Sequence, residues 1–321
     1  MKAKIGELTS IRTGKLDANA ACPDGRYPFF TCSKKPLQIS TYSYDCECVL
    51  VAGNGDLNVK YYKGKFDAYQ RTYIIEDNSG GKLYMPFLYF FMEGYIDVLR
   101  KQAIGGVIKY IKLGNLTEAI IELPSYEEQK EVVEILDKLK GIIDNETQRI
   151  RKYDDLIKAR FVELFGNPVI NSKNLRTMAL KDVLRLKAGD FTAASDISDK
   201  LTETNKYPCF GGNGIRGYVT EYNQEGEYSL IGRQGALSGN VQFAKGKFRN
   251  TEHALLVVPM VEMNDIWLNQ LLINLDLKRY QTGAAQPGLS VKNLQEISII
   301  MVPITEQNQF AAFVVEVHKS K

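Results

Sequence analysis

A single long helix is predicted for residues 125–165, because the sequence marks both its start and its end. Pro124 closes the strand-like run before it, Ser125 is a favourable N-cap residue, and Glu128 follows three positions later, as in a capping box. At Gly166-Asn167-Pro168, glycine can adopt the left-handed conformation that closes a helix and proline prevents its continuation. About forty residues make a rod of roughly 60 Å. The rest of the chain must be arranged around this rod.

Apolar residues of the rod recur at intervals of seven, which is the spacing of a coiled-coil seam. This period is narrower than the apolar stripe of a helix that lies on a globular body, so it favours a spacer whose seam meets another helix. The alternative is a helix packed on a globule. The predicted subunit-interface residues are Leu136, Ile143, Ile150, Ile157 and Leu164.

The composition is that of a globular protein with more than one domain. The chain has 321 residues, 44% of them hydrophobic, which is long enough for two separate cores. No stretch reaches 18 apolar residues and no signal-like run follows Met1–Lys4, which predicts a cytoplasmic protein without a membrane partner. Five cysteines argue against a disulfide framework, and Cys46-Glu47-Cys48 lacks the second pair that zinc sites use. We expect no metal and no cofactor.

The sequence before the rod repeats after it. In both parts, short strand-like segments and turns precede a helix, expected at 86–100 and at about 266–280; Lys63-Gly64-Lys65 is expected to be a turn, and 69–75 a strand. Corresponding landmarks keep an offset between 178 and 182 residues, which predicts two copies of one unit. The second long helix starts after Pro303, and only about a dozen of its residues precede Lys321. The landmarks are Tyr27-Pro28 with Tyr207-Pro208, Lys63–Phe66 with Lys245–Phe248, Asn115-Leu116 with Asn293-Leu294, and Pro124 with Pro303.

Residues that suit nucleic-acid contacts gather in the loops of both copies, with aromatic residues among them. Arg, Lys, Asn and Gln pair with base edges, while Lys, Ser and backbone N–H groups hold phosphates. For any single residue a merely polar loop is the simpler interpretation, but two clusters at equivalent positions of a repeat favour DNA binding. The candidate DNA-binding residues are Lys34, Asn54, Asn58, Lys60, Tyr69, Gln70 and Arg71 in the first copy, and Asn213, Arg216, Arg233, Gln234, Ser238, Asn240, Lys247, Arg249 and Asn250 in the second.

The charge is spread thinly, so phosphate binding would need such local clusters. The net charge of +3 divides into +3 for residues 1–124, −2 for the rod and +2 for residues 166–321. These values fall well short of the strongly basic surface that marks many nucleic-acid-binding domains.

The sequence contains no recognisable catalytic constellation. Of the two histidines, His318 lies near the end of the chain, and His253 is interpreted as a structural or nucleic-acid-contacting residue. The glycine-rich segments 211–214 and 232–235 match neither a P-loop nor a dinucleotide fingerprint. Motifs for methyl transfer to a base, for a nuclease site or for a nucleophile elbow are not found. We therefore expect a protein that is not an enzyme.

Five segments carry a family resemblance. They are Leu123–Gln129 and Val302–Gln307 at the helix starts, Arg160–Pro168 at the end of the rod, and Tyr207–Ile215 with Ile231–Gly235 in the second copy. Over nearly the whole chain, this arrangement resembles the specificity subunit of type I restriction-modification enzymes. In that family the globules are target recognition domains that each read one half of a split DNA sequence. The helices pack antiparallel as a ruler, and adenine methylation and cleavage belong to separate subunits.

The sequence thus predicts an α+β protein with two tandem mixed α/β globules separated by a long coiled-coil helix, and with a truncated second helix. The expected domains are 1–124 and 167–303 for target recognition, 125–166 for the spacer and 304–321 for the start of the second spacer. The resemblance implies three partners: double-stranded DNA, methyltransferase (M) subunits and, through them, restriction (R) subunits.

Because residues 306–321 can cover only the nearer third of the rod, self-association through the seam is also expected, with two rods antiparallel. The alternative function is a protein-interaction scaffold or decoy derived from such a subunit.

Overall fold

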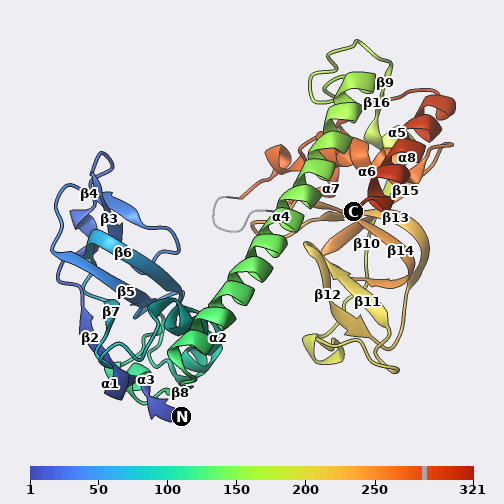
Figure 1. Ribbon diagram of the computed structural model, residues 1–321. Coiled ribbons are helices and arrows are strands. Elements are labelled where there is room, and N and C mark those ends of the chain that lie inside the picture. Colours follow the sequence, from blue (N-terminus) through green and yellow to red (C-terminus); the bar gives the residue numbers. More distant parts are fainter. Residues whose placement is uncertain (284–287) are drawn as a thin grey trace. The chain divides into compact units, whose positions relative to one another are not determined.

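The computed structural model describes residues 1–283 and 288–321, and the chain divides into two compact units, Met1–Asn145 and Glu146–Lys321 (Figure 1). The long helix α4 (Tyr126–Phe165) joins them, and the dividing point lies inside it. The fold class is the predicted one, with two β-sheet domains and a long helix between them in the chain. The predicted domain limits at 124, 166 and 303 concern sequence modules and stay a prediction.

Both ends of α4 are closed as predicted. The backbone N–H of Ser125 donates to Glu128 Oε2 at 2.8 Å, and the backbone N–H of Glu128 donates to Ser125 Oγ at 3.3 Å, which is a capping box. At the other end Gly166 has a φ of +76°, and its N–H donates to the carbonyl of Val162 at 2.8 Å.

The first unit is a six-stranded sheet in the order β2-β7-β5-β6-β3-β4, with a helix packed on one face and a separate two-stranded sheet, β1-β8, beside it. The run Cys48–Ala52 in the middle strand is apolar throughout because both faces of that strand are buried. The elements are β1 (Lys2–Lys4), α1 (Ile5–Leu8), β2 (Thr9–Thr13), the 3₁₀ helix η1 (Ala18–Ala20), β3 (Tyr27–Phe30), β4 (Leu37–Ile39), β5 (Tyr44–Ala52), β6 (Val59–Ala68), β7 (Thr72–Asp77), α2 (Met85–Gln102), α3 (Leu113–Thr117) and β8 (Ile120–Glu122).

Two apolar clusters hold this sheet, one on each face. Val49 and Val51 of β5 point toward α2, whose buried Leu88 and Met92 lie on one side of the helix. Leu50 and its neighbours on the opposite face pack in a smaller cluster with two phenylalanines. Burial on both faces makes this strand the centre of the unit.

The second unit has the sheet order β10-β15-β13-β14-β11-β12 and a separate two-stranded sheet, β16-β9. Its elements are β9 (Thr177–Ala179), α5 (Leu180–Val183), β10 (Leu184–Ala188), η2 (Ala194–Asp196), β11 (Tyr207–Gly211), β12 (Gly214–Val219), β13 (Gln224–Gly232), β14 (Val241–Asn250), β15 (Ala254–Pro259), α6 (Asp265–Asn274), η3 (Leu277–Tyr280), α7 (Val291–Gln295), β16 (Ser298–Ile300) and α8 (Ile304–Lys319).

The predicted duplication holds strand by strand. Each strand of one sheet has its counterpart at the same place in the other, and the parallel pairing of β3 with β6 recurs as that of β11 with β14. In the first unit it aligns Phe30 with Ala68, and in the second it aligns Phe210 with Asn250. These partners are offset by 180 and 182 residues, as the landmarks predict.

Three predicted elements differ from those observed. Lys63-Gly64-Lys65 lies inside β6 and is not a turn, because Gly64, with a φ of +133°, lets the strand continue through a local distortion. The predicted strand over 69–75 begins only at Thr72, after a turn. The predicted helix at 266–280 ends at Asn274, where Asp276 takes a left-handed φ of +47° before the short helix η3.

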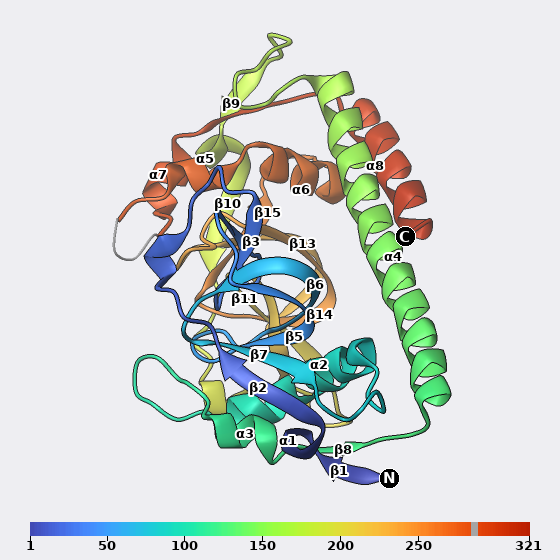
Figure 2. The ribbon, with the colours of Figure 1, turned by 60° about the vertical axis from the view of Figure 1, so that its left-hand side comes forward.

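In the second unit, α8 runs alongside the C-terminal part of α4 (Figure 2). The ring of Phe310 lies edge-to-face with those of Phe161 and Phe165, with centroids 5.4 and 5.6 Å apart. Ile157 is buried in the same core. This part of the seam is therefore covered within the unit.

The other predicted seam residues are less buried. Leu136 is half-buried, whereas Ile143, Ile150 and Leu164 are exposed. Within the described residues, no helix is both long and apolar enough to span a membrane.

Candidate nucleic-acid interface

The candidate residues of the first unit gather at one corner, where three segments meet. These are the end of β3, the hairpin loop between β5 and β6, and the turn between β6 and β7. The N–H of Gly53 in the hairpin loop donates to the carbonyl of Arg71 in the turn at 2.8 Å. From the β3 end, Cys32 Sγ donates to the same carbonyl at 3.6 Å.

The second unit has the same corner. The N–H of Arg233, the counterpart of Gly53, donates to the carbonyl of His253 at 3.1 Å, so the hairpin loop and the turn meet in the same way. Gly212, the counterpart of Cys32, lies against the carbonyl of His253 as well, where an added Cβ would approach within 3.2 Å. The two predicted clusters are thus equivalent in structure as well as in sequence.

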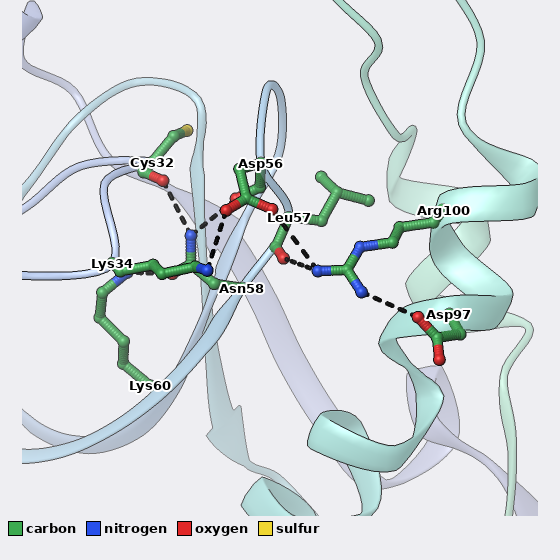
Figure 3. A network of polar contacts seen from close by, with 8 residues as sticks. All are labelled: Cys32, Lys34, Asp56, Leu57, Asn58, Lys60, Asp97 and Arg100. Carbon is green, nitrogen blue, oxygen red and sulfur yellow. Dashed lines mark hydrogen bonds and ion pairs between the residues drawn. The ribbon is translucent and has the colours of Figure 1, made fainter. Parts of the chain in front are cut away.

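A polar network stiffens the hairpin loop of the first unit (Figure 3). Asn58 Nδ2 donates to the carbonyls of Cys32 and Asp56 at 2.8 Å each, and Asn58 Oδ1 accepts from Lys60 Nζ. Both amide hydrogens of Asn58 are therefore engaged within the loop. Its contacts are those of a residue that fixes the loop.

Charged residues on two sides complete this network. The carboxylate of Asp56 receives Lys34 Nζ at 3.3 Å and an Arg100 guanidinium nitrogen at 3.5 Å. The same nitrogen of Arg100, on α2, donates to the carbonyl of Leu57 at 3.2 Å (Figure 3). A pocket of about 290 Å³ lies between the loop and α2.

Lys60 is the half-buried cation of this corner. Burial lowers its pKa below the ordinary value of 10.5, because the charged form loses hydration there. By contrast, Gln70 and Arg71 on the neighbouring turn are exposed, while Asn54 and Tyr69 are half-buried. The turn residues Gln70 and Arg71 therefore lie at the surface of the corner, whereas Lys60 is partly covered.

In the second unit an open pocket of about 410 Å³ collects four of the predicted residues. Asn213, Arg216 and Gln234 line it. Asn240 Nδ2 donates to Asn213 Oδ1 at 2.7 Å, which ties the fourth residue to the pocket. The aliphatic part of Arg216 crosses Gly211 so closely that a Cβ there would lie 2.4 Å from Arg216 Cδ, so this glycine makes room for the arginine.

His253 also lines this pocket and contacts a predicted residue. Its Nδ1 lies 2.6 Å from Gln234 Oε1, and its Nε2 lies 3.1 Å from Glu252 Oε1. Residue type alone gives no reason to single out Glu252, because its role depends on the fold of the turn.

The remaining candidates of the second unit lie away from the pocket or beneath the surface. Ser238 and Asn250 are buried, and the N–H of Asn250 donates to Asn223 Oδ1 at 2.7 Å. Arg249 Nε donates to Thr192 Oγ1 at 3.2 Å. Lys247 is exposed, and Glu225 and Tyr222 raise its pKa above the ordinary 10.5.

The sequence did not single out Asp56 and Arg100, although they join the hairpin loop to α2. An aspartate in a glycine-rich loop reads as an ordinary turn residue, and an arginine at a helix end reads as a favourable terminal charge. Their pairing across 44 positions arises only when α2 packs on the sheet. No local signal in the sequence announces it.

The paired cysteines of β5 are protonated thiols in a buried setting. Burial raises the pKa of Cys48 strongly, and burial together with a hydrogen bond to Glu76 raises the pKa of Cys46 to about 11. Among the described residues, no group of three or more His, Cys, Asp or Glu side chains is placed to hold a metal ion.

Comparisons with known proteins agree on one family. The type I restriction modification DNA specificity domain matches residues 1–152 and 172–320. The EcoDI specificity subunit of Escherichia coli, a type I restriction enzyme, is 41% identical over 155 residues, which is 48% of this chain and 34% of that protein. The EcoprrI specificity subunit of the same organism is 33% identical over 239 residues, covering 71% of this chain and 59% of that protein.

The fold agrees as well. A type I restriction-modification system S subunit from M. genitalium superposes with a TM-score of 0.63 at 18% identity, covering all of this chain and 89% of that one. The chain matches between about a third and three fifths of the length of the two E. coli relatives. Because the domain signature spans both units, this chain belongs to the type I restriction modification DNA specificity domain family.

Proposed function

We propose that the chain is a DNA sequence-recognition subunit of a type I restriction-modification complex. Each unit reads one half of a bipartite target, and α4 fixes the separation of the two halves. The observation that carries this proposal is the repeated corner: in both units the same three segments meet and display residues of base-reading type. The proposal assigns the chain no catalysis of its own.

Within each corner, accessibility divides the proposed contacts. In the first unit, Gln70 and Arg71 are exposed and Asn54 is half-buried, so we assign these three residues to DNA contacts. In the second, the residues around the open pocket take this role, namely Asn213, Arg216, Gln234 and Asn240. The exposed Lys34 and Lys247 suit contacts with phosphates. Asn58, which is bonded within its loop, and the buried Ser238 and Asn250 position the residues that contact bases.

The partners follow from α4. On its first-unit part, Val132, Ile135, Leu139 and Ile142 are exposed by 38 to 58% and follow one another at spacings of three and four. Such a stripe fits the groove of another helix. We assign it to a methyltransferase subunit in the assembled complex, through which the restriction subunit is recruited, and to an antiparallel second copy when the chain is alone.

A DNA-protection experiment tests the function. The full chain is combined with a type I methyltransferase subunit, and methylation of a library of double-stranded DNA is mapped by sequencing. We expect one bipartite sequence with a fixed gap to be modified. Modification of isolated half-sites, or methyl transfer by the chain without the added subunit, would refute the proposal.

A further inference from the structure

Three side chains form a row at the second-unit pocket, which His253 and Gln234 line. Glu252 Oε1 lies 3.1 Å from Nε2 of His253, and Nδ1 of His253 lies 2.6 Å from Oε1 of Gln234, whose side chain is exposed. The other carboxyl oxygen of Glu252, Oε2, is buried and has no hydrogen-bond partner among the described residues. The carboxylate is therefore directed at the imidazole.

Hydrogen-bonding rules restrict the protons in this row. An ionised carboxylate only accepts, so Nε2 of His253 must carry a proton to bond Glu252. Nδ1 then has two options. If it is also protonated, it donates to Gln234 Oε1, as in the observed arrangement; if it is not, it must accept, and the Gln234 amide must turn by about 180° to donate its N–H.

We propose that Glu252 and His253 are positioning residues that decide which atom of Gln234 is presented to a DNA base. This inference rests on the proposed function. With His253 charged, the amide nitrogen of Gln234 faces outward and can donate to guanine O6 or N7 or to thymine O4. With His253 neutral, the carbonyl oxygen faces outward and accepts from the amino group of adenine or cytosine.

The charge of the row therefore sets the base preference at one position of one half-site. Glu252 contacts His253 from its own turn, and the charged side chain of Arg216 lines the same pocket from β12. Arginine stays charged at all relevant pH values, and among unperturbed side chains only histidine changes charge between about pH 5 and 8. Lower pH favours the outward N–H groups and higher pH favours the outward carbonyl.

The first unit supplies an internal control. At the positions that correspond to Gln234 and His253 it has Asn54 and Arg71. Asn54 and Gln234 correspond because each forms an isolated antiparallel β-bridge, Asn54 with Tyr110 and Gln234 with Gly288. An arginine has no neutral form in this range, so the first half-site lacks the switch.

Selection of DNA at two pH values tests the inference. The full chain with a methyltransferase subunit selects from a randomised double-stranded library at about pH 6 and about pH 8. We expect one position of the second half-site to shift from guanine or thymine toward adenine or cytosine by about tenfold, with the first half-site unchanged. His253→Gln should abolish the shift, whereas His318→Gln, at the other histidine of the chain, should retain it.

A second readout needs no DNA. In ¹⁵N NMR spectra of the full chain, the side-chain amide of Gln234 should move in step with the ring nitrogens of His253 as the pH changes. An amide of Gln234 that ignores the charge of His253, or a base shift that survives in His253→Gln, would overturn the inference. Failure to select any sequence would count against DNA recognition itself. The NMR titration would still show whether the charge of His253 sets the orientation of the Gln234 amide.

Discussion

Gln129 Oε1 accepts a hydrogen bond of 2.8 Å from the backbone N–H of Tyr84, the residue that precedes α2. The amide nitrogen of Gln129 donates to the carbonyls of Lys82 and Pro124 at 2.8 and 3.1 Å, and the side chain is fully buried. One glutamine thus fastens the first turn of α4 to the start of α2.

The second unit repeats this fastening. Gln307 Oε1 accepts from the backbone N–H of Asn264 at 2.9 Å, and Gln307 Nε2 donates to the carbonyl of Val302 at 2.8 Å. Gln307 is also buried. The glutamine in the shared Glu-Gln pair at each helix start therefore has a structural reason: it satisfies partly buried backbone groups beside the helix start.

Replacing this glutamine should destabilise the first unit. Gln129→Leu leaves the N–H of Tyr84 and the carbonyl of Lys82 without partners, which should lower the free energy of unfolding by about 2–3 kcal/mol. Urea denaturation measures this loss. Gln148→Leu, at an exposed position of the same helix, is the matched control and should change stability by less than about 0.5 kcal/mol. Equal effects of the two substitutions would contradict the role of Gln129.

The capping box of α4 should weaken in acid. Hydrogen bonds from the Ser125 hydroxyl and backbone lower the pKa of Glu128 below its ordinary 4.5. A lowered carboxyl pKa stabilises the fold fully above the ordinary value, and this stabilisation is lost as the pH falls through the folded-state pKa. The melting temperature of the chain relative to Glu128→Gln should therefore fall between about pH 5 and 3. In a Ser125→Ala background this dependence should shrink, and an unchanged dependence would show that another group is responsible.

Arg233 and Lys247 should affect DNA binding in different ways. If the Arg233 guanidinium pairs with a base, Arg233→Ala should cost about 1–3 kcal/mol and relax the preference at one position. Lys247→Ala should weaken binding to all sequences alike and reduce its salt dependence, because a phosphate contact carries no sequence information. Binding of a panel of single-base variants of the target, at two salt concentrations, separates these outcomes. The same sequence preference in both variants would refute the assignment of Arg233.

Two positions on α4 should separate assembly from folding. Leu139 is 50% exposed, so Leu139→Asp should reduce association with methyltransferase subunits and with a second copy while leaving the melting temperature nearly unchanged. Ile157 is 2% exposed in the core under α8, so even Ile157→Ala should cost about 2–4 kcal/mol. Sedimentation and thermal unfolding of both variants make the comparison. A clean monomer at micromolar concentration that Leu139→Asp does not alter would show that the chain alone does not self-associate through the stripe.

The architecture could be predicted largely because it is repeated and because its long helix is bounded by strong local signals. Ser125, Glu128 and Gly166 act through bonds to residues a few positions away, which sequence patterns capture well. The constant offset between landmarks then gave the order of elements twice. Where the sequence interpretation was wrong, as at Gly64, the local glycine signal was real but the pairing of β6 with β5 carried the strand through it.

The sequence could predict which loops form the site, but not which of their residues lie at its surface. Residue types indicated loops of base-reading character, but burial, which depends on the packed sheet, separates the surface residue Arg71 from the buried Asn250. The engaged amide of Asn58 and the row from Glu252 to Gln234 likewise depend on distances between loops. Such distances leave no periodic trace in a single sequence.

In each unit the first and last strands pair with each other: β1 lies against β8, and β9 against β16. The N-terminal ammonium group of Met1 even donates to the carbonyl of Leu123 at 3.0 Å. The first and last strands of each globule thus lie side by side, immediately before a long helix begins. A globule attached in this way can be exchanged for another, or its loop sequences can change, while the pair of terminal strands and the helix keep their structure. If each unit reads one half of a DNA target, as proposed, exchanging one globule would change one half of that target and leave the rest of the protein unchanged.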